Sequence, residues 1–418
     1  MATVIIGSGA AGMAAAARLR KLGEEVVLVS RERAVYSLCA LPYVLSGEVD
    51  EERIITHDEA ALRKMGVTPH LGAEARAIDP ARRRVILADG KELEYDILLL
   101  ATGSVPFRPP PLGGELPGVH TFNSLQDTRE LISAAAVSRS AVVLGAGLTG
   151  LECACALRRR GLEVTVVEME DRVLPRALDR DMSPPVEEAL AKGGVGLKLG
   201  TRVTGLSRAG GRSAVRIQGP GGKEGTLEAD MVVLCLGVRP ELSLASSAGL
   251  RTNRGVIVGP DMRTSDPHIF AAGDIAEFEG VIPATWPTAV KQGEIAAVNM
   301  VGEMASFTHF DNVNVATIFG LPVFSIGKTA SQLEGSPVEC ELWREGGVWR
   351  KLVTINGAVA GYQSVGSHDV YGVPSILQRT AGPLMKRFLR FGASHPLLAS
   401  GALEAAGSNG PRVRKRKS

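Results

Sequence analysis

The stretch Val4-Ile5-Ile6-Gly7-Ser8-Gly9-Ala10-Ala11-Gly12 opens a unit that runs to Glu32 and decides the fold. After the three glycines comes an alanine-rich segment, Met13 to Leu22, and then a second apolar run, Val26 to Val29. This order predicts a strand, a tight turn, a helix and a second strand. In such a turn the first glycine lets the chain reverse, the second lets backbone approach a pyrophosphate, and the third lets the helix pack on the strand. Phosphates bind at the helix N-terminus, where N–H groups are free. The stretch therefore predicts a dinucleotide-binding unit.

The same unit occurs a second time without a gap. Gly7 matches Gly145, Gly12 matches Gly150 and Gly23 matches Gly161, and the apolar runs on either side also correspond. One genuine site beside one chance glycine cluster does not explain a match over the whole unit. Two nucleotide cofactors are therefore expected.

The two copies differ at the end of their second strand. A carboxylate there, about 20 residues after the glycines, accepts hydrogen bonds from a ribose 2′-hydroxyl and repels a 2′-phosphate. The second copy has Glu168 at this position, which predicts a preference for NADH over NADPH. The first copy has Ser30, with Glu32 two residues later, and we expect Glu32 to make the ribose contact.

The composition limits the classes of protein to which this chain can belong. The chain has 418 residues, 45% hydrophobic and 22% charged, with a formal net charge of +2, which gives no reason to expect nucleic acid. No apolar run approaches the roughly 20 residues of a membrane helix, and the first strand leaves no room for a signal peptide, so we expect no membrane association and a cytoplasmic location. The five cysteines, without paired spacing, argue against a disulfide framework, and no metal site is expected.

Between the glycine motifs, the chain predicts further segments of the same folds. Tyr95 to Leu100 is a buried strand ending in Ala101-Thr102-Gly103, and a linker rich in proline and glycine follows from Pro106 to Gly114. Beyond the second motif, Leu178 to Lys192 is expected to be a helix, and Met231 to Leu236 a strand.

Two later features bear on the cofactor sites. An apolar strand ends at Ala272-Gly273-Asp274, where the aspartate can bind a sugar-alcohol chain or simply form a turn. A helix follows from Thr288 to Val301, and its N-terminus can oppose negative charge.

From about Thr308 the pattern becomes antiparallel, with Asn356-Gly357 as a two-residue hairpin turn. The strands are expected at Val313 to Phe319, Val323 to Ile326, Val338 to Trp343, Val348 to Ile355 and Val359 to Gly366. A helix is expected from Ser375 to Phe391, and the basic tail ending in Arg412 to Lys417 reads as a frayed terminus.

Together these motifs resemble the FAD-dependent pyridine nucleotide-disulfide oxidoreductases, over about residues 1 to 300. The resemblance implies an α/β fold with two Rossmann-like dinucleotide-binding domains, for FAD and NAD, and a smaller α+β C-terminal domain. The implied domains are a discontinuous FAD domain (1–110 and 238–305), an NAD(P) domain (111–237), a C-terminal interface domain (306–400) and a flexible basic tail (401–418). It also implies a homodimer.

The resemblance also assigns site residues, to which the ribose candidates Glu32 and Glu168 are added. Glu152 is implied to lie by the nicotinamide. The implied FAD-binding residues are Gly7, Gly9, Ala11, Gly12, Ala101, Thr102, Gly103, Gly273 and Asp274, and the implied NAD-binding residues are Gly145, Gly147, Gly150 and Gly237.

Cys39 decides between branches of the family. A lone cysteine is usually a small buried hydrophobe, and only its environment makes it a nucleophile. The run Ser37 to Tyr43 resembles the single-cysteine coenzyme A-disulfide and persulfide reductases, in which this cysteine is the redox nucleophile. The single-cysteine NADH oxidases and peroxidases have a histidine in the first glycine turn, where this chain has Ala10. Beside a flavin at a helix N-terminus, we expect the pKa of Cys39 to be lowered.

The C-terminal third favours a second branch. Phe319 to Gly327 and Trp349 to Val353 resemble NADH:rubredoxin reductases and a domain of nitrite reductases, which pass electrons to a protein or a further redox centre without the cysteine. The leading interpretation sends electrons from NADH through FAD to Cys39 and on to a low-molecular-weight disulfide or persulfide such as coenzyme A disulfide. In the alternative, Cys39 is structural and the partner is an electron-carrier protein. A third interpretation is a flavin-binding subunit of a larger redox complex.

Overall fold

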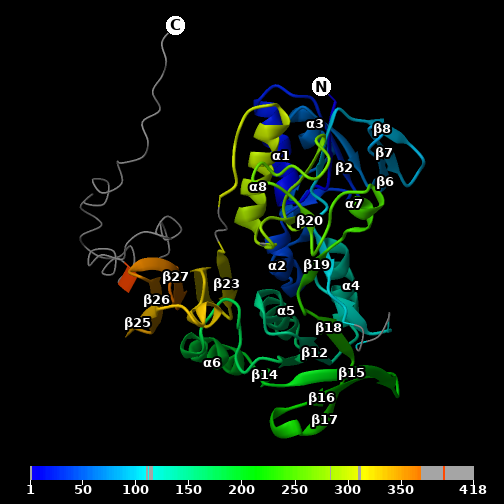
Figure 1. Ribbon diagram of the computed structural model, residues 1–418. Helices are drawn as coiled ribbons and strands as arrows, with labels where there is room; N and C mark the ends of the chain where they lie inside the picture. Colours follow the sequence, from blue (N-terminus) through cyan, green and yellow to red (C-terminus); the bar gives the residue numbers. More distant parts are fainter. Residues whose placement is uncertain are drawn as a thin grey trace. The chain divides into compact units, whose positions relative to one another are not determined.

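The computed structural model describes residues 2–109, 112, 116–282, 284–308, 312–368 and 389–390. The chain forms two compact units (Figure 1). The first comprises Met1–Pro175 and Val186–Val313, and the second comprises Arg176–Pro185 and Asn314–Ser418.

The first unit contains a parallel sheet built around the opening stretch of sequence. Apart from the edge strand β5, its strands are short, mostly buried apolar runs, typical of parallel strands covered on both faces. The strand order is β21-β9-β1-β2-β5. The edge strand β21 therefore comes from a much later part of the chain than its neighbour β9. The bounds are β1 Thr3–Ile6, β2 Val26–Ser30, β5 Val67–Leu71, β9 Ile97–Leu100 and β21 Ile269–Ala271.

Two helices pack against each other beside this sheet (Figure 1): α1, Ala10–Lys21, and α8, Trp286–Met300. A Cβ at Gly293 of α8 would lie 2.2 Å from the carbonyl oxygen of Ala11, so only glycine permits this approach. Since Ala11 belongs to the glycine turn, α8 is fixed directly against that turn.

A second parallel sheet in the same unit repeats the design, with the order β11-β18-β12-β13-β14. The strands are β11 Val119–Thr121, β12 Ser140–Leu144, β13 Glu163–Val167, β14 Val195–Lys198 and β18 Met231–Leu234. The helices α4, Leu125–Ala135, and α5, Leu148–Arg159, belong to this part. The predicted α/β class with repeated Rossmann-like halves is confirmed.

Small elements complete the first unit. Two three-stranded antiparallel sheets are present, and two-stranded pairs join β3 to β4, β10 to β19 and β20 to β22. The sheets comprise β6 Ala75–Asp79, β7 Arg84–Leu87 and β8 Glu92–Glu94, and β15 Arg202–Ala209, β16 Arg212–Gln218 and β17 Glu224–Ala229. The pairs comprise β3 Val35–Tyr36, β4 Ile55–His57, β10 Ser104–Pro106, β19 Val238–Pro240, β20 Val256–Ile257 and β22 Ala276–Glu277. The short helices are α2 Leu41–Ser46, α3 Glu59–Lys64 and α7 Ser243–Ser247.

The second unit is an antiparallel sheet, as predicted, with the order β23-β24-β27-β26-β25. Asn356 and Gly357 both have positive φ, 49° and 76°, which suits the expected hairpin turn between the last two strands. The predicted helix from Ser375 to Phe391 falls outside the described residues except for Leu389 and Arg390, and the tail lies wholly outside them. The strands are β23 Asn314–Ile318, β24 Leu321–Gly327, β25 Val338–Glu345, β26 Val348–Ile355 and β27 Ala358–Val365.

The predicted single helix from Leu178 to Lys192 is wrong. A 3₁₀ turn, Arg180–Met182, precedes a separate helix α6, Pro184–Lys192. Proline is suited to the first turn of a helix and not to its interior, so Pro184 and Pro185 begin α6.

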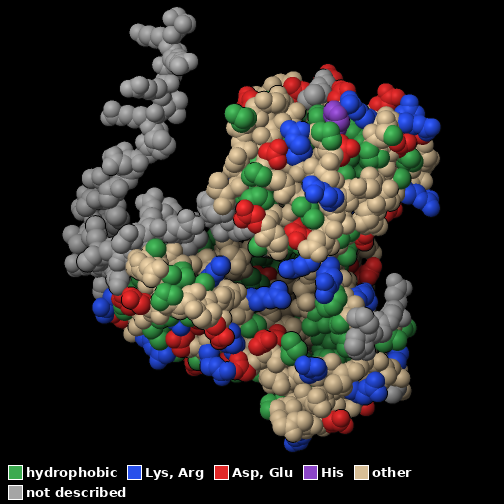
Figure 2. All heavy atoms as spheres, in the orientation of Figure 1, with side chains coloured by type: hydrophobic (Ala, Val, Ile, Leu, Met, Phe, Trp, Pro, Cys, Tyr) green, Lys and Arg blue, Asp and Glu red, His purple; other side chains and the backbone are tan. Residues whose placement is uncertain are grey.

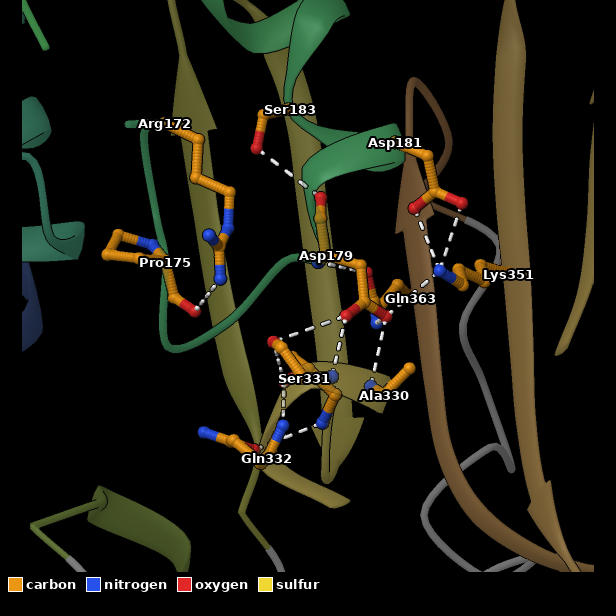
Figure 3. Close-up of polar contacts among 11 residues, drawn as sticks. Arg172, Pro175, Asp179, Asp181, Ser183, Ala330, Ser331, Gln332, Lys351 and Gln363 are labelled. Carbon is orange, nitrogen blue, oxygen red and sulfur yellow. Dashed lines mark hydrogen bonds and ion pairs between the residues drawn. The ribbon is translucent and has the colours of Figure 1, made fainter. Parts of the chain in front are cut away.

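Asp179, just before the 3₁₀ turn, is buried in a polar cluster (Figure 3). Its carboxylate lies 3.2 Å from Nζ of Lys351 and accepts a 2.7 Å hydrogen bond from Gln363. Lys351 also contacts Asp181 at 2.8 Å. Although burial opposes ionisation, the hydrogen bonds from Gln363 and the backbone N–H of Ala330 hold the pKa of Asp179 below its usual value. The cluster thus fixes this segment to β26 and β27.

Candidate active site

The first glycine turn lies between β1 and α1. A Cβ at Gly7, where φ is +109°, would lie 2.1 Å from the carbonyl oxygen of Ala101, and one at Gly12 would lie 2.0 Å from that of Gly7. Both glycines are therefore required by packing. Gly9 is different: its φ is −73°, and a Cβ there would meet no atom of the described chain within 4 Å. Protein packing does not require a glycine at this position, but the approach of a pyrophosphate does.

The N-terminus of α1, the helix that follows this turn, is suited to bind an anion. Within the described chain, α1 has no side-chain cap at Gly9 and no acidic residue in its first turn. Other helices are capped: Asp58 accepts from a backbone N–H at the start of α3, and Ser124 does so at the start of α4. The uncapped N–H groups and the dipole of α1 fit a phosphate, as FAD would provide.

The three segments implied to bind FAD meet at one edge of the sheet, because β1, β9 and β21 are parallel neighbours. Ala101-Thr102-Gly103 follows β9, and Gly273-Asp274 follows β21. A Cβ at Gly273 would lie 3.0 Å from that of Ala11. The carboxylate of Asp274 accepts a 3.0 Å hydrogen bond from Ser104, while burial raises its pKa.

Gln292 of α8 supports the same edge and was not singled out from the sequence. Its side-chain oxygen accepts a 2.8 Å hydrogen bond from the backbone N–H of Gly273. Its amide nitrogen is buried and has no partner within the described chain. A buried donor without a partner, next to the glycine turn, is consistent with a site in which a bound cofactor accepts this hydrogen bond. No periodic or motif signal marks this glutamine in the sequence.

The first ribose candidate, Glu32, lies just beyond β2. Its backbone N–H donates to the hydroxyl of Ser30 at 3.1 Å, and that hydroxyl is 2.8 Å from the hydroxyl of Ser8 in the glycine turn. The Glu32 carboxylate lies 4.0 Å from Nε of Arg31. The end of β2 is thus tied to the turn through two serines, with Glu32 next to them.

The second glycine turn repeats the first. A Cβ at Gly145, where φ is +104°, would lie 2.4 Å from the carbonyl oxygen of Cys235, and one at Gly150 would lie 2.0 Å from that of Gly145. A Cβ at Gly147 would again meet no atom of the described chain within 4 Å, and α5 starts without a side-chain cap or an early acidic residue. Gly237 follows β18 with φ +92°. The turn fits a second dinucleotide.

Glu168 points back to this turn. Its carboxylate accepts a 2.6 Å hydrogen bond from the backbone N–H of Ala146 and a 2.9 Å bond from that of Glu170. Ala146 and Glu168 occupy the positions of Ser8 and Ser30 in the first copy, which are also in contact. In both copies, therefore, a residue of the glycine turn contacts the last residue of the second strand or the residue just after it. In the first copy the contact joins two hydroxyls, and in the second copy it joins a backbone N–H to a carboxylate.

Cys39 lies in a 3₁₀ turn, Leu38–Ala40, directly before α2, and its side chain is exposed. Leu38 and Tyr43 on either side are also exposed, by 47% and 43%. Cys153 and Cys155 are buried in α5 instead. Cys39 is therefore a thiol that a reagent can reach.

The structure brings Cys39 and Glu152 close enough to interact electrostatically, since α2 packs against α5. Arg160 donates to the carbonyl of Leu45, and Arg159 pairs with Glu48. Burial raises the pKa of Glu152 to about 7. Partial removal from water and the Glu152 carboxylate raise the pKa of Cys39 in the protein chain alone, and the lowering expected beside a flavin stays a prediction. The residue lies at a short 3₁₀ turn, not at the N-terminus of a long helix.

The described residues were compared with two other kinds of site, a metal centre and a membrane-spanning helix, and contain neither. Within them, no group of three His, Cys, Asp or Glu side chains could hold a metal ion. None of the helices in this part of the chain is long and apolar enough to span a membrane. Figure 2 shows basic and acidic side chains interspersed on the visible face of the protein.

Comparisons with known proteins agree with these features. A family model described as pyridine nucleotide-disulphide oxidoreductase matches residues 1–293. An NADH oxidase of Methanocaldococcus jannaschii is 36% identical, over 79% of this chain and 77% of that protein. A rubredoxin-NAD(+) reductase of Pseudomonas putida is 35% identical, over 72% of this chain and 80% of that protein. The solved structure of a NAD-dependent persulfide reductase from A. fulgidus is similar, with a TM-score of 0.83 and 30% identity, over 97% of this chain and 84% of that one.

Proposed function

Because this chain belongs to the pyridine nucleotide-disulphide oxidoreductase family, we propose that it reduces a low-molecular-weight disulfide or persulfide through the thiol of Cys39. The chain is an FAD-dependent NAD(P)H oxidoreductase, and it binds FAD and NADH. The proposal concerns the acceptor to which the electrons pass.

The residues for holding the two cofactors are those of the glycine turns. The open space at Gly9, the uncapped start of α1 and the Asp274 edge would hold FAD; Gly147, the start of α5 and Glu168 would hold NADH. When bound, FAD would supply the two-electron chemistry that links a hydride donor to a disulfide acceptor. The protein's part is to orient both nucleotides and to present the acceptor.

The observation that carries the proposal is the placement of Cys39. Its thiol is exposed in a turn, within electrostatic reach of Glu152, the residue that the family resemblance assigns to the nicotinamide. A structural cysteine is typically buried, as Cys153 is. An accessible thiol beside the hydride-transfer residue is suited to disulfide exchange.

The chemistry balances with the NADH that the enzyme consumes. The Cys39 thiolate attacks one sulfur of the disulfide, a Cys39 mixed disulfide forms, and one thiol leaves. Two electrons from NADH and one proton then cleave the mixed disulfide, which releases the second thiol and restores Cys39. The overall reaction is NADH, a proton and one disulfide giving NAD⁺ and two thiols.

An acceptor screen tests the proposal. Under anaerobic conditions, NADH oxidation is measured with coenzyme A disulfide, other small disulfides, a persulfide, rubredoxin and an artificial dye. Cys39→Ser should abolish reduction of the disulfide or persulfide substrate and leave dye reduction intact. Cys340→Ser is the matched control, since Cys340 is also exposed but lies in the second unit. Unchanged disulfide reduction by Cys39→Ser would refute the proposal.

A specific observation favours a second candidate, an NADH:electron-carrier-protein reductase. The raised pKa of Cys39 leaves less thiolate at neutral pH, and the exposed Leu38 and Tyr43 beside it offer apolar surface to a protein. A relative named rubredoxin-NAD(+) reductase has comparable identity. In the same screen, fast reduction of rubredoxin by wild type and Cys39→Ser alike would support this candidate.

A further inference from the structure

Two cysteines that the proposed reaction does not use lie together at the second glycine turn. Cys235 directly follows β18, and a Cβ at Gly150 would lie 3.3 Å from that of Cys235. Cys153 lies three residues after Gly150 on α5, and residues at that spacing share one face of a helix. The Cys153 thiol is fully buried, and the Cys235 thiol, which is partly exposed, is near enough to help raise the pKa of Cys153. The two thiols are therefore neighbours, and one of them is open to solvent.

The first copy of the repeat shows that packing does not require this pair. Ala15 and Ala101 occupy the matching positions there, and a Cβ at Gly12 would lie 3.4 Å from that of Ala101. Ala15 is fully buried, as Cys153 is. The same helix, turn and strand thus assemble with alanine at both places. Alanine side chains are sufficient for packing at these two positions, so the two thiols provide a reactivity that packing does not require.

We propose that Cys153 and Cys235 form a reversible disulfide that lowers the affinity of the second glycine turn for NADH. The oxidant is a hydroperoxide. The partly exposed Cys235 thiol reacts with hydrogen peroxide to give a sulfenic acid and water. The Cys153 thiol then displaces a second water and forms the disulfide, while an external dithiol reverses the step by exchange.

The surrounding contacts couple this bond to the turn. The sulfurs must close to about 2.05 Å, which draws Cys235 towards α5. The Cys235 carbonyl is already in tight contact with Gly145, and its N–H donates to Leu144 at 2.9 Å. Because this backbone has no free space beside Gly145, the movement displaces the turn at which the pyrophosphate of NADH binds.

The proposal is tested on the FAD-loaded enzyme treated with hydrogen peroxide. Peptide mapping after alkylation should show a cross-link between Cys153 and Cys235 that a dithiol removes. The KM for NADH in dye reduction should rise by at least about tenfold, with kcat and bound FAD little changed. Dye reduction and peptide mapping do not involve Cys39, so this result is independent of the proposed acceptor.

Three variants separate the proposal from general oxidation damage. Cys153→Ala and Cys235→Ala reproduce residues that the first copy accommodates, and in both the KM for NADH should no longer respond to peroxide. Cys155→Ala is the matched control and should respond as wild type does, because Cys155 lies two residues from Cys153 and faces away from it on the helix. Both thiols remaining free in wild type after treatment would overturn the proposal, as would a complete cross-link that leaves the KM unchanged.

Discussion

The backbone N–H of Ala146 donates a 2.6 Å hydrogen bond to the carboxylate of Glu168, which places that carboxylate at the glycine turn proposed to bind NADH. The matching contact in the first copy joins the hydroxyls of Ser8 and Ser30. One site thus presents a negative charge next to its turn where the other presents neutral hydroxyls. The difference leads to a prediction about the choice of nucleotide.

Glu168 should make the enzyme prefer NADH over NADPH. Its charge repels a 2′-phosphate, so we expect a preference in kcat/KM of one to two powers of ten, on the order of 1.4–2.8 kcal/mol. Glu168→Arg should narrow or reverse this preference in steady-state kinetics with both nucleotides. Glu170→Arg makes the same change of charge two residues away and should have a smaller effect. Equal use of NADH and NADPH by wild type would show that Glu168 does not face the ribose.

Gly9→Val should prevent FAD binding without unfolding the protein. The φ of Gly9 is −73° and its surroundings are open, so valine fits the chain but occupies the space that a pyrophosphate needs. We expect colourless protein, with a Kd for FAD at least about a hundredfold higher than in wild type.

Gly147→Val is the matched control for that experiment, because Gly147 has the same open surroundings in the second turn. It should purify yellow but require far more NADH for reduction of its flavin. Loss of FAD from Gly147→Val, with retention by Gly9→Val, would reverse the assignment of the two sites.

The pKa of Glu152 gives the stability a defined dependence on pH. Burial raises this pKa from 4.5 to about 7, so the folded state favours the protonated carboxyl. The resulting stabilisation is fully present below about pH 4.5 and is lost as the pH rises through about 7; it is at most about 3 kcal/mol. Urea unfolding of cofactor-free protein should show this loss in wild type and not in Glu152→Gln. If the unfolding free energies of wild type and Glu152→Gln changed with pH in the same way, this prediction would be contradicted.

Lys351 should stabilise the second unit. Lys351→Met leaves the buried carboxylate of Asp179 without its cation, and breaking a buried pair in this way costs about 3–5 kcal/mol. The remaining hydrogen bond from Gln363 favours the lower end of that range. Urea unfolding measures the loss. The exposed Lys328 in the same unit provides a control, and Lys328→Met should change the unfolding free energy by less than about 0.5 kcal/mol.

The sequence predicted the parts of the fold that local rules determine. Gly12 and Gly150 contact Gly7 and Gly145 in their own turns, and the motif with its gap-free repeat was sufficient to place both turns, although Gly7 and Gly145 also contact the distant Ala101 and Cys235. The antiparallel strands after residue 312 are short runs rich in β-branched and aromatic residues, and Asn356-Gly357 marks their last turn. The helix predicted from Leu178 failed for two reasons: Pro184 and Pro185, a local signal, begin a separate helix, and Asp179 is buried against Lys351 and Gln363, which are distant in the chain.

The site was less predictable for a similar reason. The pKa of Cys39 is raised by burial and by Glu152, which is on a different helix, and no local sequence pattern indicates either effect. Gln292 and Cys235 also make contacts with distant parts of the chain. Gln292 accepts a hydrogen bond from Gly273, and the carbonyl of Cys235 packs against Gly145. The domain limits, the homodimer and the cytoplasmic location inferred from the sequence stay predictions.

An anaerobic NADH titration of disulfide-treated enzyme tests the central claim, that Cys39 carries electrons to the acceptor, most directly. Wild-type protein is incubated with coenzyme A disulfide, freed of excess reagent and titrated while flavin absorbance and released thiol are followed. We predict that it consumes about two molar equivalents of NADH per FAD, one for the flavin and one for the Cys39 mixed disulfide, and releases one thiol. Cys39→Ser should consume about one equivalent and release none. Equal consumption by the two proteins, with no thiol released, would contradict the claim and favour direct transfer to an electron-carrier protein.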